Sequence, residues 1–309
     1  MKSSNREYGF TIGICASDSA PSLGDLLKRI RAERFPREMP LLKIIVVASG
    51  CSRSAIGLLL EFQKYDRRMH LIEEEKRKGK AEAINKIICN SVGNYLLFVN
   101  SDALPVKGAM SAILTMLRQD QSAGVISGNP YFERRVGSTA GVQRLMWLVH
   151  NECSERLNHM AIGNHGSDEL MAVRSELLEP LPQDIVNDGA YIAGRAKQRG
   201  FYIKFCNSAG VEIDVPKNIA DTISQRRRII FGHFQIWKVT GSSPRTVESL
   251  LISSPVLGVG IIVKILARHR ELIAMLPIAC VEEVIALSLA IKDRLVSTEM
   301  HGVWKRYGR

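Results

Sequence analysis

The sequence contains no C-x-x-C pair, and its six cysteines are scattered along 309 residues. They are Cys15, Cys51, Cys89, Cys153, Cys206 and Cys280. Closely spaced cysteine pairs are typical of structural zinc sites, so this spacing argues against such a site. Several of the cysteines lie in apolar or helical runs, which indicates reduced, mostly buried thiols in a cytosolic protein.

Other features are also missing from the sequence. The first ten residues, MKSSNREYGF, are polar, so no signal peptide is visible. We find no internal repeat and no low-complexity tract. Prolines, a glycine and two glutamates interrupt the apolar stretches 249–266 and 272–291. Neither stretch is therefore the uncharged span of about 20 residues that a simple transmembrane helix needs.

The composition is that of a globular protein with an excess of positive charge. Apolar residues make up 46% of the chain and charged residues 24%, which is enough to bury a large core. There are 42 Lys and Arg against 31 Asp and Glu, giving a net charge of +11. This excess favours anionic partners such as nucleotides, phosphates, nucleic acid or an acidic membrane surface.

Short apolar runs alternate with amphipathic stretches through the first 130 residues. The predicted strands are 10–17, 41–49, 70–74, 95–100 and 123–128, and the predicted helices are 23–35, 53–66, 80–91 and 106–119. Repeated strand–helix–strand units imply an α/β fold, with a mainly parallel sheet and helices on both faces. The nearly unbroken apolar strands fit burial of both faces of this sheet.

After residue 130 the pattern is less regular. Helices are expected near 137–160, 186–199 and 218–232, and a strand at 201–206. We expect the α/β domain to cover 1–240 and a helical C-terminal region to cover 241–309. Basic residues flank the two apolar stretches of that region: Arg268, Arg270, Lys292, Arg294, Lys305 and Arg306. The stretches are either interfacial helices beside anionic headgroups or a soluble hairpin packed on the domain.

Polar residues follow four of the predicted strands. Ligands of open parallel sheets bind beyond the carboxyl ends of the strands. Ser17 and Asp18 follow the first strand, Ser49 ends the second, and the basic loop EEEKRKGK follows the third. The fourth strand leads into NSD at 100–102. One site can therefore hold a base, a ribose, phosphates and a divalent cation at Asp102. A bare turn at NSD is the alternative.

The order of these elements resembles the nucleotide-diphospho-sugar transferases of the GT-A fold, specifically glycosyltransferase family 2. The matching stretches, spread over residues 8–235, are IIVVASGCS, KGKAEAIN, FVNSDALP, DGAYIAGRAKQRGFYIKF and QRRRIIFGH. The resemblance implies a GT-A, Rossmann-like α/β domain with a helical C-terminal appendage. It also implies a site that binds a nucleoside-diphosphate sugar.

The resemblance assigns roles to four residues in the first half of the chain. Asp102 corresponds to the last Asp of the family's D-x-D motif, which holds the metal on the donor diphosphate. Asn100 stands where the first Asp usually stands, so the motif reads N-x-D and carries one charge fewer. Lys80 and Asn85 correspond to the lysine and asparagine of a G-K-x-x-A-x-N element. A helix-surface amide is the alternative role for Asn85.

The stretch SQRRRIIFGH resembles the family's Q-x-x-R-W element. Gln225 and Arg228 match that element, and Ile229 stands in place of its tryptophan. In the family this helix closes the donor site beside the diphosphate, where the planar fork of an arginine can bind phosphate oxygens through two bonds. The alternative is a solvated basic helix face. Ser17, Asp18 and Ser49 complete the predicted donor site.

The catalytic base departs from the family pattern. An inverting sugar transfer needs a carboxylate that accepts the proton of the acceptor hydroxyl. The family places this Asp eleven residues before a glycine–aromatic step, and counting back from Gly200 leads to Gly189. Asp188, one residue earlier, is the predicted base, and Asp184 is a weaker candidate. Alternatively, Asp188 caps the following helix, or the chain binds the donor without turnover.

The resemblance predicts an inverting, metal-dependent glycosyltransferase that uses Mg²⁺ or Mn²⁺. It would move a sugar from a nucleoside-diphosphate sugar to a glycan hydroxyl or to a polyprenyl or other lipid acceptor, as in cell-envelope glycan biosynthesis. We expect a cytoplasmic location that includes the cytoplasmic face of the membrane, with peripheral contact through 249–291 and no nucleic-acid partner. A sugar nucleotidyltransferase, a non-catalytic sugar-nucleotide-binding protein and a membrane-surface scaffold are the alternatives.

Overall fold

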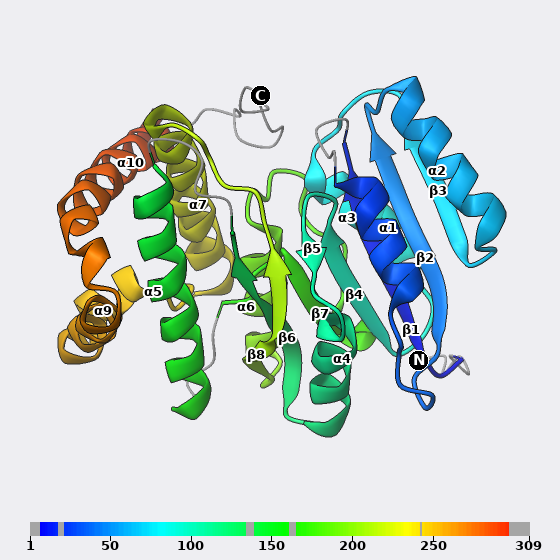
Figure 1. Cartoon of the computed structure of the whole chain (residues 1–309), viewed down its shortest axis with the longest axis horizontal. Helices are drawn as coiled ribbons and strands as arrows, with labels where there is room; N and C mark the ends of the chain where they lie inside the picture. The colour runs from blue at the N-terminus through cyan, green and yellow to red at the C-terminus, as the bar shows by residue number, and fades with distance from the viewer. Residues whose placement is uncertain (1–6, 18–21, 134–138, 161–164, 242, 297–309) are drawn as a thin grey trace.

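The computed structural model describes residues 7–17, 22–133, 139–160, 165–241 and 243–296. Its centre is an eight-stranded sheet in the order β3-β2-β1-β4-β7-β6-β8-β5 (Figure 1). In that order the strands are Met69–Glu74, Leu41–Ser49, Phe10–Ala16, Tyr95–Asn100, Leu170–Arg174, Ala123–Tyr131, Tyr202–Glu212 and Leu104–Pro105. All the strands predicted from the sequence are present in this sheet.

Two strands run against the direction of the others. β7 pairs antiparallel with both of its neighbours, β4 and β6. β5 pairs antiparallel with β8 at the sheet edge, whereas β1, β2, β3 and β4 pair in parallel and so do β6 and β8. The expectation of a mainly parallel sheet is therefore confirmed, with β7 inserted in reverse near its middle.

Helices cover both faces of the sheet, as predicted. The helices of the first 240 residues are α1 Leu23–Ala32, α2 Arg53–Tyr65, α3 Lys80–Asn90, α4 Ala109–Gln119, α5 Ala140–His159, α6 Asp188–Gln198 and α7 Ile219–Thr240. Buried residues of α1, α2 and α4 share one apolar cluster with the sheet, and those of α3 and α6 share another. Alternate residues of the strands enter the two clusters because side chains along a strand point to opposite faces.

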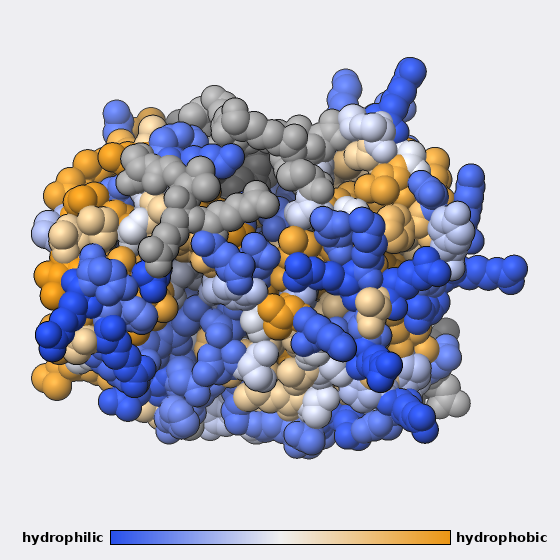
Figure 2. Space-filling view, in the orientation of Figure 1, coloured by the Kyte–Doolittle hydropathy of each residue, from blue (hydrophilic) through white to orange (hydrophobic). Residues whose placement is uncertain are grey.

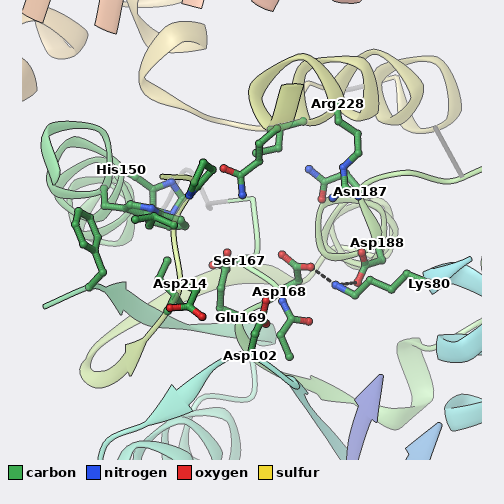
Figure 3. A pocket seen from close by; sticks show the side chains of 18 of the residues that line it. Lys80, Asp102, His150, Ser167, Asp168, Glu169, Asn187, Asp188, Asp214 and Arg228 are labelled. Atoms are coloured by element: carbon green, nitrogen blue, oxygen red, sulfur yellow. Dashed lines mark hydrogen bonds and ion pairs between the residues drawn. The ribbon is translucent and has the colours of Figure 1, made fainter. Parts of the chain in front are cut away.

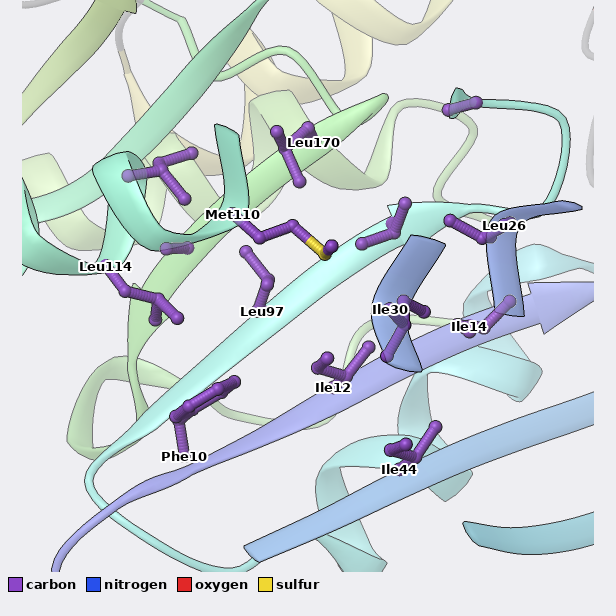
Figure 4. Close-up of a cluster of buried hydrophobic side chains, with 14 of the residues drawn as sticks. Phe10, Ile12, Ile14, Leu26, Ile30, Ile44, Leu97, Met110, Leu114 and Leu170 are labelled. Atoms are coloured by element: carbon purple, nitrogen blue, oxygen red, sulfur yellow. The ribbon is translucent and has the colours of Figure 1, made fainter. Parts of the chain in front are cut away.

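The first cluster makes the amino-terminal half of the sheet rigid. Ile12 and Ile14 of β1 are fully buried against Leu26 and Ile30 of α1, and Leu97 of β4 belongs to the same cluster (Figure 4). Burying one such side chain is worth roughly 1.5–3 kcal/mol relative to leaving it exposed. The loops that follow β1, β2 and β4 therefore start from fixed positions.

The C-terminal region is helical and packs on the domain. It comprises α8 Val247–Ser253, α9 Pro255–Arg268, a short 3₁₀ segment η2 Arg270–Met275, and α10 Leu276–Val296. α8, α9 and η2 share an apolar cluster with α5, and α10 packs on α7 (Figure 1). Pro255 is the first residue of α9, a position that does not need its missing N–H.

Two features of α7 and the C-terminal helices differ from the sequence prediction. α7 continues to Thr240 rather than ending near 232, because Ile236 joins the core against α6 and Gly241 ends the helix at φ 71°. Among the described residues, one helical stretch, Arg270–Val296, is long and apolar enough to cross a membrane. Only 17% of its most apolar window is buried, so most of that surface faces outwards.

Candidate active site

A cavity of about 900 Å³ lies at the carboxyl ends of β1, β2 and β4 (Figure 3). Its walls also include α5, α7, the amino-terminal ends of α3 and α6, and the segment before β7. The predicted residues that line it are Ser17, Ser49, Lys80, Asn100, Asp102, Asp188, Gln225 and Arg228. Residues from distant parts of the sequence thus meet at the sheet edge where α/β proteins bind ligands.

The stretch after β4 forms a turn and also contributes to the cavity. The amide of Ala103 donates to the carbonyl of Asn100 at 3.0 Å, which closes the turn. Asp102 lies within that turn, and its side chain is exposed towards the cavity. Partial removal of water, with the negative charges of Asp168 and Asp214, raises the pKa of its carboxyl. A cation placed beside Asp102 would relieve this electrostatic penalty.

Lys80 holds two aspartates of the cavity wall. It is the first residue of α3, and its Nζ contacts Oδ2 of Asp168 and, at 3.1 Å, Oδ2 of Asp188 (Figure 3). Burial lowers the pKa of Lys80, but the two carboxylates outweigh burial and raise that pKa above its usual value. The ammonium is therefore charged, and it neutralises carboxylates of the protein itself.

Asp188 is the first residue of α6, and it does not cap that helix. The neighbouring Asn187 is the N-cap, because its side-chain oxygen accepts a hydrogen bond from the amide of Ala190 at 3.1 Å. Asp188 is buried and faces Lys80. Burial and the charge of Asp168 raise the pKa of its carboxyl.

The sequence prediction did not single out Asp168 or Glu169. β7 runs antiparallel to β4, with Leu170 opposite Val99, so residues 167–169 lie beside 100–102. Burial and the charge of Asp168 raise the pKa of Glu169 to about 7. Two acids directly before an apolar strand were the available sequence signal. The rule that ligands bind after strand ends missed them, because in a reversed strand the starting end faces the site.

The three consecutive arginines of α7 do different things. Arg226 forms ion pairs with Glu248 of α8 and Glu283 of α10, and Arg227 pairs with Asp293 of α10. Arg228 lines the cavity, and its positive charge contributes to lowering the pKa of Asp168. Successive residues of a helix point about 100° apart, which separates these roles. The basic stretch is therefore not a uniformly solvated helix face.

The structure places one of the predicted donor residues, Asn85, away from the predicted donor site. Asn85 is absent from the described cavity wall, because its amide donates to the carbonyl of Leu181 at 2.8 Å and accepts from the amide of Leu181 at 2.7 Å. Its side chain fixes the loop before α6, so the predicted donor contact through Asn85 is not supported. Asp18 lies outside the described residues.

Three histidines, His150, His165 and His233, line the cavity, and Figure 3 places His150 on the side opposite Lys80. The ring centroids of His150 and His165 are 5.1 Å apart, and those of His165 and His233 are 6.0 Å apart. Burial lowers their pKa values to about 3, about 4 and about 3, respectively, so all three rings are neutral near pH 7. Trp147 packs edge-on against His150 and extends this wall.

The described residues contain no group of three or more His, Cys, Asp or Glu side chains placed to hold a metal ion. A cation at Asp102 would therefore take its other ligands from a bound molecule or water. Part of the cavity wall carries charged groups around Asp102, Lys80 and Arg228, and another part carries the neutral histidine rings, with the ion-paired Arg226 and Glu248 close to them.

Comparison with solved structures identifies the class of fold. A mannosyltransferase from Pyrobaculum calidifontis, solved with GDP-Man and Mn²⁺, superposes with a TM-score of 0.65 at 19% identity. The match covers 94% of this chain and 88% of that one. Glucosyl-3-phosphoglycerate synthase from Mycobacterium tuberculosis, solved with Mn²⁺, UDP and glucosyl-3-phosphoglycerate, has a TM-score of 0.55 at 13% identity over 77% of this chain and 81% of that chain. The fold is that of the GT-A glycosyltransferases.

The family follows from the sequence. The model of glycosyl transferase family 2 matches residues 11–178, which is more than half of the chain, and the chain belongs to this family. The expected resemblance is confirmed. Poly-beta-1,6-N-acetyl-D-glucosamine synthase from Staphylococcus aureus is 18% identical over 232 residues, covering 74% of this chain. The match covers 55% of that relative, so the chain spans about half its length.

Proposed function

We propose that the chain is a glycosyltransferase that moves a sugar from a nucleoside-diphosphate sugar to a hydroxyl or lipid-phosphate acceptor, with inversion at the anomeric carbon. The observation that carries the proposal is a cavity at the carboxyl ends of the strands. Asp102, Arg228 and the two aspartates that pair with Lys80 all line it. Membership of glycosyl transferase family 2 supports the same reaction class. One named neighbour of the fold was solved with the sugar nucleotide GDP-Man, and another with the nucleotide UDP.

In this proposal the donor binds along the strand ends. Ser17 and Ser49 would contact the base and ribose, and Gln225 and Arg228 on α7 would contact the diphosphate. Asp102 would hold Mg²⁺ or Mn²⁺, since its exposed carboxylate offers the hard oxygen ligands that these cations prefer. The cation would offset negative charge on the departing diphosphate. Asn100 can hydrogen-bond the ribose or a water.

The acceptor's proton would go to the aspartates held by Lys80. The acceptor oxygen attacks the anomeric carbon on the side opposite the diphosphate, which leaves with the electron pair of its bond to that carbon. Asp188, the base predicted from the sequence, faces this region from α6. Arg228 can stabilise charge that develops on the leaving diphosphate.

The first experiment is a thermal-shift screen of UDP, GDP and dTDP, each with and without Mn²⁺. We expect one nucleotide to stabilise the protein only with the metal, because a ligand of the native state stabilises by mass action, by about 2.7 kcal/mol at 100 times its Kd. Asp102→Ala should abolish the shift, while Glu61→Ala, an exposed acid on α2, should keep it. If no nucleotide shifts the folded wild type, the proposal is wrong.

We propose further that residues 241–309 form an appendage that binds the cytoplasmic face of a membrane through the surface of 249–291. α8, α9 and α10 expose many large apolar side chains, including Ile252 of α8 at 86% and Val256 of α9 at 89%. Figure 2 places orange, hydrophobic residues over this side of the molecule. Arg268, Arg270 and Lys292 flank the surface, and cationic flanks favour anionic headgroups.

The contacts of α10 with α7 favour an arrangement in which α10 lies on the membrane surface rather than crossing the membrane. Glu283 and Asp293 of α10 pair with Arg226 and Arg227 of α7. These acids are ten residues apart, about 15 Å along a helix, so α10 is attached to the domain over much of its length. Only its outer face is available to lipid, which is the arrangement of an interfacial helix.

Liposome flotation tests this surface. We expect the wild type to float with phosphatidylglycerol-containing vesicles and to float less in high salt or with pure phosphatidylcholine, because salt and neutral lipid weaken the electrostatic contribution. The Ile252→Asp/Val256→Asp variant should lose most of this binding. Leu60→Asp/Val92→Asp, which places the same charges at exposed apolar sites elsewhere, should retain it. Equal flotation of both variants would exclude the surface.

A further inference from the structure

Lys80 holds two aspartates that differ in their access to the cavity. The side chain of Asp188 is 8% exposed and that of Asp168 is 31% exposed, although both contact the same ammonium. A group that takes a proton from an acceptor hydroxyl must come within hydrogen-bond reach of it. Resting on the proposed sugar transfer, we propose that Asp168 is the carboxylate that accepts this proton, and that Asp188 positions it through Lys80.

A glycine on α6 makes room for Asp168. A Cβ atom placed on Gly189 would lie 3.1 Å from Cβ of Asp168 and 3.1 Å from the carbonyl oxygen of Gly166. Side chains at 189 and 168 therefore compete for the same space. The family pattern puts an acid at the position of Gly189, and in this chain a carboxylate enters that space from the segment before β7 instead. The acid at 168 then takes the place of the acid that is missing at 189.

The surrounding charges keep Asp168 in the form that a base needs. Burial would raise the pKa of Asp168, but Lys80 and Arg228 outweigh burial and hold that pKa below its usual value. Asp168 is therefore ionised near pH 7, and its contact with Lys80 fixes its orientation. Asp188 lies deeper, on the other side of Lys80, where it orients the ammonium. The three side chains form one row, with Asp168 at the cavity end (Figure 3).

The chemistry needs no further reactant. The acceptor oxygen forms a bond to the anomeric carbon, and the bond from that carbon to the diphosphate oxygen breaks. The nucleoside diphosphate leaves with the electron pair, and the hydroxyl proton passes to a carboxylate oxygen of Asp168. Arg228, whose positive charge helps to lower the pKa of Asp168, lies on α7 beside the expected diphosphate position. Proton acceptor and leaving-group stabiliser are thus neighbours in one cavity.

Single substitutions separate the two aspartates. The assay uses the full chain and measures release of nucleoside diphosphate from UDP-glucose, UDP-N-acetylglucosamine and GDP-mannose with Mn²⁺, with water and a lipid extract as acceptors. We expect Asp168→Asn to lower kcat by roughly 10²–10⁴-fold, the usual range for a general base, while the donor-induced thermal shift remains. Asp188→Asn should lower kcat by less than about tenfold. Asp184, the weaker candidate for the base, is exposed and does not line the cavity. The control is Glu61→Gln, which changes an exposed acid on α2 and should leave kcat unchanged.

Moving the carboxylate from position 168 to position 189 distinguishes a catalytic role of Asp168 from a structural one. Gly189 has no left-handed backbone conformation, and an acid in the first turn of α6 suits the helix dipole. Asp168→Gly should lose activity, and Gly189→Asp alone should crowd Asp168. The double variant Asp168→Gly/Gly189→Asp removes the Cβ at 168, moves the acid across the 3.1 Å contact and should recover at least about tenfold of the lost kcat. A merely structural Asp168 would not be rescued in this way.

The outcomes divide clearly. If wild type binds none of the sugar nucleotides, the proposed function itself fails. If it binds a donor and Asp168→Asn keeps more than half of the wild-type kcat, the inference is wrong while the function stands. A large loss in Asp188→Asn beside a small loss in Asp168→Asn would assign the base to Asp188. Donor binding without turnover in wild type would also overturn the inference, since no group then acts as base.

Discussion

Replacing Lys80 by methionine is expected to destabilise the protein by roughly 3–5 kcal/mol at pH 8, the usual cost of removing one partner from a buried ion pair. Methionine keeps most of the length of the side chain but leaves Asp168 and Asp188 without their shared counter-charge. Asp188 is nearly buried, so its negative charge cannot be hydrated instead. Urea unfolding of wild type and variant measures the difference.

The loss in Lys80→Met should depend on pH. Without the ammonium, the folded-state pKa of Asp168 should rise above its unfolded value near 4, and the pKa of Asp188, which is already raised, should rise further. A carboxyl group whose pKa is higher in the folded than in the unfolded protein stabilises the fold fully below the unfolded pKa. That stabilisation is lost as the pH rises through the folded pKa. The variant should therefore lie closer to wild type at pH 5 than at pH 8.

A surface pair provides the matched control. Lys28→Met removes an ion pair with Asp25 in which both side chains are largely exposed, and such pairs are worth about 0–1 kcal/mol. Its effect should be small and nearly independent of pH. A Lys80→Met variant that unfolds within 1 kcal/mol of Lys28→Met at pH 8 would contradict the role given to Lys80.

The amino-terminal half of the fold was accessible from the sequence. The strand predicted at 41–49 is β2, Leu41–Ser49, and the predicted strand 10–17 is β1, Phe10–Ala16. These strands are buried on both faces, so their apolar runs are nearly continuous and end where polar loops begin. Because parallel strands present their carboxyl ends on one edge, the meeting of Ser17, Ser49 and Asp102 could also be predicted.

The reversed strand β7 explains what the sequence did not reveal. Asp168 meets Lys80 across 88 residues of sequence, and only the antiparallel pairing of β7 with β4 brings them together. The histidine wall has the same origin, since His150, His165 and His233 come from α5, the segment before β7, and α7. No spacing along the chain encodes these contacts.

Asn85 illustrates a different limit. A polar residue in an amphipathic helix can face solvent, a site or a neighbouring loop, and periodicity does not distinguish these partners. Both ends of the Asn85 amide bind the backbone of Leu181, 96 residues away. The motif predicted a donor contact for this asparagine, whereas the structure shows it supporting the loop that carries Asp188 into the cavity.

Arg226→Ala is expected to lower the free energy of unfolding by roughly 3 kcal/mol, at the lower end of the cost of breaking a buried pair because its partners are partly exposed. Arg226 Nη2 donates to Glu248 Oε1 at 2.9 Å and to Glu283 Oε1 at 2.9 Å, and Nε donates to Glu283 Oε2 at 2.7 Å. One guanidinium thus joins α7, α8 and α10. Its loss leaves two carboxylates facing each other without a cation.

The arginine fork, rather than charge alone, should account for much of this effect. Arg226→Lys keeps the positive charge but cannot bind Glu283 through two parallel bonds, so its stability should fall between those of wild type and Arg226→Ala. Arg144→Ala is the control, because the Arg144–Glu271 pair is exposed and should contribute at most about 1 kcal/mol. Urea unfolding compares all three variants.

The position of Arg226 extends the expected effect to the cavity. Its neighbours Gln225 and Arg228 line the cavity from α7, and the helices that Arg226 ties together carry the apolar surface. Arg226→Ala should therefore weaken both the nucleotide-induced thermal shift and the flotation with anionic vesicles, whereas Arg144→Ala should change neither. If Arg226→Ala is destabilised but keeps both the thermal shift and the flotation, the C-terminal helices are joined to the domain without supporting its site.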